Sequence, residues 1–124
     1  MKVFNKKGFA ALAAVALLAA ACGGATETGK TLTIGISLPL SGSSLASAGP
    51  AREGALLAVK EISIDGYTIE TKILDHAVDG VHNPAQAATD MTTLVGDESV
   101  VAVVGPFNSS SAKAQIPVSS EAGL

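Results

Sequence analysis

The chain has 124 residues, with eight basic and eleven acidic side chains, a formal net charge of -3 and 3% aromatic residues. Beyond the N-terminus the basic residues stand singly, so we exclude a nucleic-acid-binding surface, which needs a basic patch with interleaved aromatic residues. The single cysteine forms no disulfide within the chain, so stability must come from one modest hydrophobic core.

The N-terminal segment predicts a secretory signal. It starts with three lysines, and residues 8–21 form an uncharged apolar run too short to cross a bilayer comfortably as a helix. Three alanines precede Cys22, which resembles the lipobox of bacterial lipoproteins, whose cysteine is lipid-modified and begins the mature chain. We therefore expect a lipoprotein signal peptide at residues 1–21 and a lipid on Cys22. An ordinary signal peptide and a retained short anchor are the alternatives.

Removal of the signal peptide leaves 103 residues with five basic and eleven acidic side chains, a net charge of -6. Residues 22–30 are mostly Gly, Ala, Thr and Glu without a hydrophobic period, which predicts a flexible tether between a membrane and a folded domain.

The folded domain is predicted to begin with a strand and a helix. Residues 31–38 alternate apolar with small or polar side chains, which predicts a strand that ends near Pro39. Turn-forming residues 41–44 follow. Pro50 suits the first turn of a helix whose apolar residues recur at helical spacing up to Ile62.

A second strand and helix follow. Alternation over residues 67–74 predicts a half-exposed strand near a sheet edge, after the turn signal Asp65-Gly66. We expect residues 75–82 to form a loop. Asn83-Pro84 predicts the start of a helix, because Asn caps free amides and Pro fits the first turn.

The third strand is predicted at Val100–Val104, where an unbroken apolar run favours burial on both faces. Ser109 or Ser110 is expected to cap a third helix. Pro117 predicts a kink or an early end in it, and Gly123 is typical of a helix terminus.

Alternating strands and helices with short connections predict an α/β fold, one half of a doubly wound parallel sheet. In a sheet of order two, one, three, the outer edge of Val100–Val104 is left unpaired, and we infer a truncated chain.

Four segments in order resemble the leucine/isoleucine/valine-binding family of type I periplasmic solute-binding proteins: residues 34–42 (IGISLPLSG), 54–62 (GALLAVKEI), Asp75 with 83–88 (NPAQAA), and 103–111 (VVGPFNSSS). The resemblance implies two flavodoxin-like α/β lobes that close on an amino acid or a similar acid or amide and deliver it to an ABC permease. Residues 31–124 would then be part of the N-terminal lobe.

The loops 40–50 and 105–110 are expected to face one cleft, because ligands of open α/β sheets lie beyond the carboxyl ends of the strands. Free amides at a helix start bind a carboxylate without a basic side chain. The resemblance implies that Ser109 binds the ligand carboxylate, with Phe107, Asn108 and Ser110 beside it. The alternative is that Ser109 and Ser110 only cap the helix.

Ser47 is expected to line the cleft from the first loop. Relatives with branched-chain ligands often carry an aromatic residue near this position, whereas this chain has Ala46, Ser47 and Ala48. The identity of the ligand is therefore open, and amides, urea and aromatic acids remain alternatives to branched-chain amino acids.

We predict no metal, no cofactor and no catalytic residue. Asp75, His76, Asp79 and His82 lack a tight ligand spacing and are read as solvated loop residues, with Asp75 ending its strand and ordering the loop. Neither a Gly-x-Ser-x-Gly nor a Gly-x-Gly-x-x-Gly motif surrounds the serines or Gly105.

The favoured function is that of a substrate-binding lipoprotein of an ABC importer. The protein would be exported, and either lipid-anchored to the outer face of the cytoplasmic membrane or periplasmic. An extracellular sensory ligand-binding domain of the same fold is the alternative, and a small flavodoxin-like enzyme is a third hypothesis.

Overall fold

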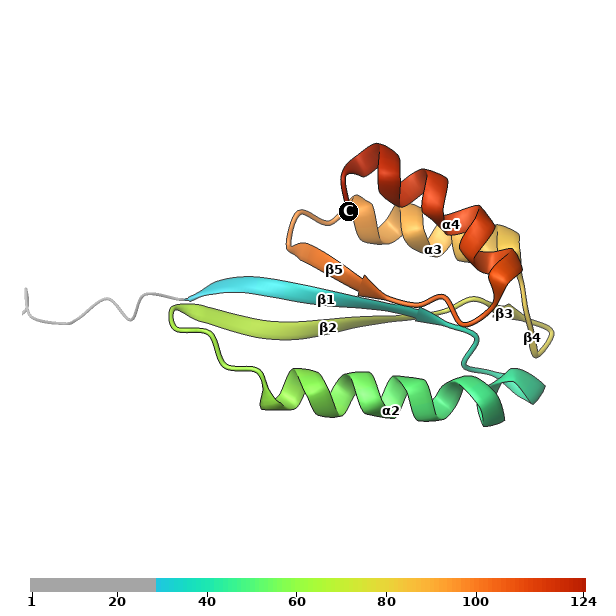
Figure 1. Ribbon diagram of the computed structural model, residues 1–124, viewed down its shortest axis with the longest axis horizontal. Helices are drawn as coiled ribbons and strands as arrows, with labels where there is room; N and C mark the ends of the chain where they lie inside the picture. Colours follow the sequence, from blue (N-terminus) through green and yellow to red (C-terminus); the bar gives the residue numbers. More distant parts are fainter. Residues whose placement is uncertain (1–28) are drawn as a thin grey trace, which may run out of the picture.

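A computed structural model describes residues 29–124 (Figure 1). The elements are β1 (Lys30–Leu38), the 3-10 turn η2 (Gly42–Ser44), α2 (Leu45–Glu61), β2 (Tyr67–Asp75), β3 (Ala77–Val78), β4 (Val81–His82), α3 (Pro84–Val95), β5 (Val100–Val104) and α4 (Ser109–Ala122). The predicted signal peptide and most of the predicted tether lie outside the described residues. Lys30, which we assigned to the tether, is the first residue of β1.

The main sheet has three parallel strands in the order β2-β1-β5. This confirms the predicted α/β class and the predicted strand order. Figure 1 shows α2 on one face of the sheet and α3 with α4 on the other. The parallel arrangement places the carboxyl ends of all three strands at one end of the molecule. Within residues 29–124, no helix combines the length and hydropathy needed to span a bilayer.

The hydrophobic core forms around β1, the central strand. Ile36 and Leu38 are fully or almost fully buried against Ala48 of α2. The alternate residues of β1 face the other helices, where Leu94 of α3 is fully buried. The period of two in the sequence therefore divides β1 between two helical layers, which is what a central strand of a doubly wound sheet requires.

The first helix starts earlier than the sequence predicted. It begins at Leu45, so Pro50 lies inside it and not in its first turn. Proline costs a helix the hydrogen bond to the carbonyl four residues earlier, here that of Ala46, which is exposed. Burial of Ala48 and Gly49 in the same stretch favours the longer helix.

The start of α3 confirms the prediction for Asn83-Pro84. Asn83 is the N-cap, its side-chain oxygen accepts a hydrogen bond from the Gln86 amide at 2.9 Å, and Pro84 occupies the first helical position. Amides in the first turn of a helix have no partner within the helix. The Asn83 side chain accepts a hydrogen bond from one of them, and Pro84 has no N–H group that needs a partner.

Strand β5 is more exposed than the sequence predicted. Only Val100 is buried, whereas Val101 is 49% and Val104 38% exposed. The reason is that β5 pairs with β1 alone and, among the described residues, no strand covers its other edge. The predicted unpaired outer edge is thereby confirmed.

The structure contradicts the capping prediction for α4, excludes the early end that was one of two alternatives at Pro117, and confirms the terminus at Gly123. Asn108 is the N-cap, so neither Ser109 nor Ser110 caps the helix. The helix also continues through Pro117 to Ala122 and does not end early. Gly123 closes it with a left-handed backbone (φ 76°), as its position predicted, and Leu124 N donates to Ser119 O at 2.9 Å in a Schellman-type end.

Candidate ligand-binding site

Three loops meet at the carboxyl end of the sheet and surround a depression of about 230 Å³. They are the segment after β1 with η2, the hairpin β3–β4 after β2, and the segment between β5 and α4 (Figure 1). Open parallel sheets bind their ligands at this end. The lining residues are Pro39, Ser43, Ser44, Ser47, Val81, His82, Phe107 and Asn108.

The structure brings three of the five predicted site residues together. Ser47, Phe107 and Asn108 all line the depression, and the Phe107 side chain is 51% exposed there. Ser109 and Ser110 follow directly in the first turn of α4. Both are exposed, but they do not belong to the lining.

The first turn of α4 has no side-chain cap. The Asn108 side chain makes no capping hydrogen bond, and the first amide of the turn with a partner is that of Ala112, which donates to Asn108 O at 2.9 Å. Within residues 29–124, the amides of Ser109, Ser110 and Ser111 therefore donate to no protein acceptor. Such amides, at the positive end of the helix dipole, form a site for an anionic group.

The segment between β5 and α4 depends on Gly105. This residue has a φ of 131°, and a Cβ atom at its position would lie 2.1 Å from Ser37 O. Any larger residue would push the segment away from β1. Gly105 thus lets the chain turn tightly over the end of the sheet and places Phe107 and Asn108 at the depression.

The hairpin β3–β4 was missed in the sequence analysis, which predicted a loop over residues 75–82. Ala77 pairs with His82 and Val78 with Val81, and Asp79-Gly80 forms the two-residue connection with positive φ angles of 52° and 78°. Asp-Gly between β-branched residues is a strong hairpin signal, so Val78-Asp79-Gly80-Val81 could have revealed it.

The turn of the hairpin packs directly on η2. Gly80 O accepts hydrogen bonds from Ser44 N at 3.4 Å, Ser43 Oγ at 3.1 Å and Ser44 Oγ at 3.4 Å. Gly42 approaches so closely that a Cβ atom on it would lie 2.2 Å from the Cα of Gly80. The first loop and the hairpin therefore form one wall of the depression.

Asp75 orders the neighbouring segments, as the sequence predicted. Its Oδ1 accepts hydrogen bonds from the amides of Leu40 at 2.7 Å and Ala77 at 2.8 Å, which joins the segment after β1 to the segment after β2. Partial burial raises the pKa of Asp75, but the amides of Ala77 and Leu40 outweigh this and hold the pKa below its usual value.

A buried polar network lies beneath the site and was not predicted. Ser37 Oγ donates to Asp90 Oδ2 at 3.1 Å, lies 3.1 Å from His76 Nδ1, and accepts from Gln115 Nε2 at 2.7 Å. Gln115 also donates to the carbonyl of Ala87 at 3.0 Å. Burial lowers the pKa of His76, so its ring is neutral near pH 7. These bonds hold α4 against β1 and α3, and with it the uncapped first turn.

The four Asp and His residues considered as a metal site have four separate environments. Asp75 accepts hydrogen bonds from backbone amides, and His76 is buried. Asp79 is in the hairpin turn, and His82 lines the depression. In the described part of the chain, no group of three or more His, Cys, Asp or Glu side chains has a metal-binding arrangement. The prediction of solvated loop residues is wrong for His76, which is fully buried with its Nδ1 atom 3.1 Å from Ser37 Oγ of β1.

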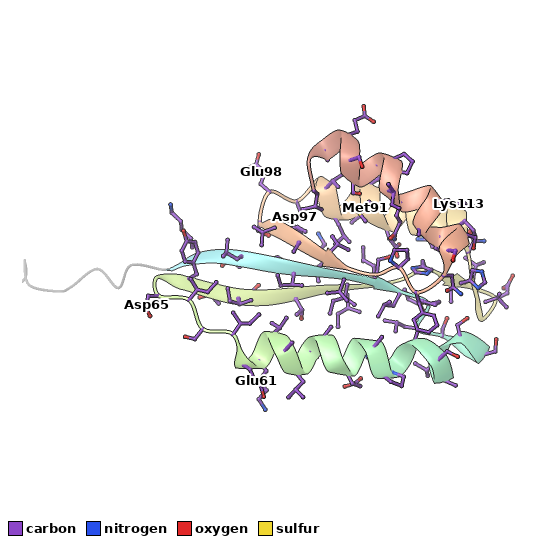
Figure 2. The ribbon with its side chains drawn as sticks, viewed as in Figure 1. Glu61, Asp65, Met91, Asp97, Glu98 and Lys113 are labelled. Carbon is purple, nitrogen blue, oxygen red and sulfur yellow. The ribbon has the colours of Figure 1, made fainter. Side chains whose placement is uncertain are left out.

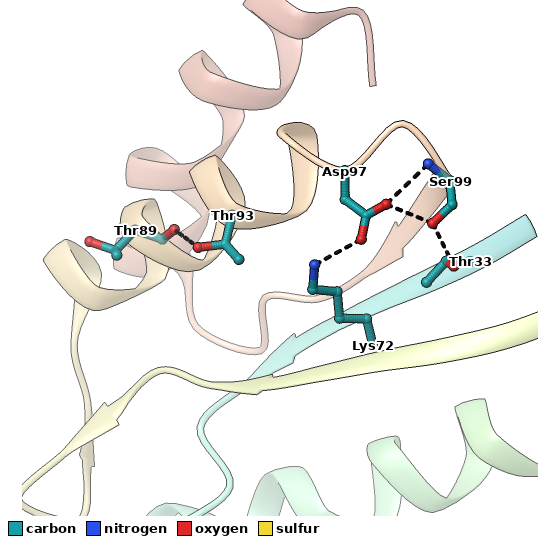
Figure 3. Close-up of polar contacts among 6 residues, drawn as sticks. All are labelled: Thr33, Lys72, Thr89, Thr93, Asp97 and Ser99. Carbon is teal, nitrogen blue, oxygen red and sulfur yellow. Dashed lines mark hydrogen bonds and ion pairs between the residues drawn. The ribbon is translucent and has the colours of Figure 1, made fainter.

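The other end of the sheet carries a separate polar cluster (Figure 3). Lys72 Nζ donates to Asp97 Oδ2 at 2.8 Å, and the Ser99 hydroxyl donates to Asp97 Oδ1 at 2.7 Å. The bonds from Lys72 and Ser99 lower the pKa of Asp97 to about 2. Figure 2 shows Asp65, Asp97 and Glu98 towards this end. No carboxylate lines the depression at the opposite end.

Comparison with known proteins agrees with this geometry. A model of the periplasmic binding protein family matches residues 31–124. Among curated proteins, none matches the sequence.

Two solved structures resemble the chain. The branched-chain amino acid transporter substrate-binding protein LivJ from Streptococcus pneumoniae, in complex with isoleucine, is 40% identical with a TM-score of 0.65, over 77% of this chain and 27% of its own. A possible leucine/isoleucine/valine-binding protein from Rhodopirellula baltica is 28% identical with a TM-score of 0.68, over 80% and 27%. The chain thus spans about a quarter of the length of either protein.

The family is one of binding proteins, which confirms the prediction that the chain is not an enzyme. The match extends over the whole described sheet and its helices. The chain therefore belongs to the periplasmic binding protein family, in the group that contains the leucine/isoleucine/valine-binding proteins.

Proposed function

We propose that this chain is the N-terminal ligand-binding part of the substrate-binding component of an ABC importer, and that it captures a branched-chain amino acid or a related small molecule. Membership of the family supports a solute-binding role and an exported, periplasmic protein. The isoleucine bound to the similar protein from Streptococcus pneumoniae supports an amino-acid ligand. A second lobe and the ABC permease are further parts of this proposal.

One observation carries the proposal. The amides of Ser109, Ser110 and Ser111 have no protein partner in the described chain, and they follow Phe107 and Asn108 at the depression. In our proposal the ligand carboxylate accepts hydrogen bonds from these amides and from the Ser109 hydroxyl. The helix dipole stabilises the negative charge, so no basic side chain is required.

The remaining predicted residues would bind the rest of the ligand. Phe107 offers an exposed apolar ring, and Ser47 of α2 lines the same depression. Asn108 and Ser110 flank the carboxylate site. Closure of a second lobe would exclude water and strengthen each of these hydrogen bonds.

The proposal is tested with Ser109→Ala in the full-length protein. A hydrogen bond to a charged group contributes about 1.5 to 3 kcal/mol, so Kd for leucine, isoleucine or valine should rise about tenfold or more. Isothermal titration calorimetry measures the change. Ser120→Ala, an exposed serine near the other end of the same helix, is the control and should bind as the wild type does. Equal affinities for the Ser109 variant and the wild type would exclude this role for Ser109.

We also propose that residues 1–21 are a lipoprotein signal peptide and that Cys22 carries the lipid that anchors the protein. The basic start, the short apolar run and the alanines before the only cysteine support this assignment.

A further inference from the structure

The polar groups that line the depression differ in whether they already have partners. The hydroxyls of Ser43 and Ser44 donate to Gly80 O. The side chains of Ser47 and His82 make no hydrogen bond to another residue of the described chain. Around them, Pro39, Val81 and Phe107 supply apolar surface.

The backbone holds His82 from both sides. It pairs with Ala77 in the hairpin, two residues after the Gly80 carbonyl that binds η2. It directly precedes Asn83, whose amide donates to His76 O at 2.9 Å and whose side chain caps α3. The backbone that carries the half-buried imidazole is therefore fixed at the depression before any ligand arrives, which lowers the entropic cost of a contact with the ring.

The imidazole changes what the site can recognise. Ser47 is small, so the lining has no large side chain on α2. The imidazole of His82 is the largest polar side chain of the lining, and it can both donate and accept hydrogen bonds, as can the smaller Ser47 hydroxyl and Asn108 amide. When ligand binding removes water, a purely aliphatic ligand side chain would leave this ring without a partner. An unpartnered buried polar group is costly, and sites built around one reject isosteres that lack the matching group.

We infer that His82 is a specificity-determining residue, and that it selects an amino acid with a hydrogen-bonding side chain over the aliphatic amino acid of the same shape. This inference rests on the proposed function, because it requires that the depression binds an amino acid. It narrows the ligand class, since threonine would be preferred to valine and asparagine to leucine.

The test uses the full-length protein and the isosteric pair threonine and valine. Isothermal titration calorimetry gives the ratio of the two Kd values for the wild type, for His82→Leu and for His82→Gln. We expect the wild type to bind threonine about tenfold more tightly. His82→Leu should bring the ratio to about one or reverse it, and His82→Gln, which keeps a hydrogen-bonding group, should retain a preference for threonine. Val78→Leu, on the same hairpin but outside the lining, is the control and should keep the wild-type ratio.

The outcomes separate the two proposals. Two outcomes overturn the role of His82 and leave the proposed function intact. In the first, His82→Leu has the same ratio of Kd values as the wild type. In the second, the wild type itself binds valine more tightly than threonine. Failure of the wild type to bind any amino acid overturns both. Because the ratio is measured within one protein sample, partial misfolding of a variant lowers the number of sites without changing the ratio. If His82→Leu does not fold, His82→Ala replaces it, and a threonine preference that stays at the wild-type ratio in this variant overturns the inference.

Discussion

At the scale of single residues, three aspartates of this lobe act as hydrogen-bond acceptors that join segments distant in the sequence. Asp75 holds the amides of Leu40 and Ala77, and Asp90 accepts from Ser37 within the buried network. Asp97 accepts from Lys72 of β2 and from Ser99 (Figure 3). These carboxylates connect the segments by hydrogen bonds in a chain whose single cysteine cannot form an internal disulfide.

Asp97 makes the stability of the protein depend on pH in the acid range. Its pKa in the folded protein is about 2, below the ordinary value of 3.8, so the ionised form stabilises the fold. This contribution is complete above about pH 4 and is lost as pH falls through about 2. We expect Asp97→Asn to lower Tm at pH 7 and to differ progressively less from the wild type between pH 4 and pH 2, as followed by circular dichroism. Glu98→Gln, at the exposed neighbouring position, is the control. A Tm difference that stays constant over this range would contradict the assignment.

Single residues also show where sequence reasoning reached its limit. The role of Asp75 was predictable because a strand end followed by a loop needs acceptors for free amides. The capping role of Ser109 was predicted wrongly because the extended backbone lies one residue earlier, at Asn108. The burial of His76 was not predictable from its polar neighbours, since its ring packs against Ser37, which lies 39 positions earlier in the sequence.

At the scale of the elements, long periodic segments were predicted correctly, whereas the short hairpin was missed because only its Asp79-Gly80 turn signals it. The alternation in β1 predicted a strand correctly, because it is repeated over several residues. The Asn83-Pro84 pair predicted the start of α3 correctly, because this pair is a specific signal for a helix start. Strands β3 and β4 have only two residues each, which is too short for a period to appear. The start of α2 was missed because burial of Ala48 and Gly49 outweighs one hydrogen bond lost at Pro50.

The contact between the hairpin and η2 can be tested through Gly42. An alanine there would need a positive φ of 57° and would place its Cβ 2.2 Å from the Cα of Gly80. We expect Gly42→Ala to lower the free energy of unfolding by more than about 1 kcal/mol, measured by urea denaturation. Gly54→Ala in α2 is the matched control. Its Cβ meets no atom within 4 Å, so the same change should stabilise the protein by up to about 1 kcal/mol. Similar effects at the two positions would show that the close approach is unimportant.

At the scale of the whole molecule, the two ends of the sheet carry different groups. The carboxyl ends of the strands carry the hairpin, the depression and the uncapped start of α4. The other end carries the Asp97 cluster and the first residue of β1. Strand order and class followed from the alternation of elements, and two of the three loops around the depression were predicted to face one cleft. The contribution of the hairpin was not predicted, because its place depends on its contacts with η2.

The proposed lipid on Cys22 belongs to this scale. We expect the wild type to be recovered in the membrane fraction of the producing cells, and mass spectrometry of its N-terminal peptide to show an acylated cysteine. Cys22→Ala should be found in the soluble fraction or remain uncleaved, because the thiol that receives the lipid is absent. The Ser109→Ala variant, fractionated in parallel, should stay with the membrane. Recovery of wild-type protein without acylation at Cys22 would contradict the anchor.

The position of Lys30 at the start of β1 has a geometric consequence for the proposed lipid anchor. The depression lies beyond Leu38, at the far end of the same strand, and a nine-residue strand is about 30 Å long. Seven residues separate Cys22 from Lys30, and this segment spans at most about 28 Å. A protein anchored through Cys22 could therefore place β1 perpendicular to the membrane, with the depression far from the bilayer and open to solute. It could also place β1 parallel to the membrane, with the depression next to a permease in the bilayer. Ligand capture and ligand transfer would then take place in two different orientations of the anchored protein.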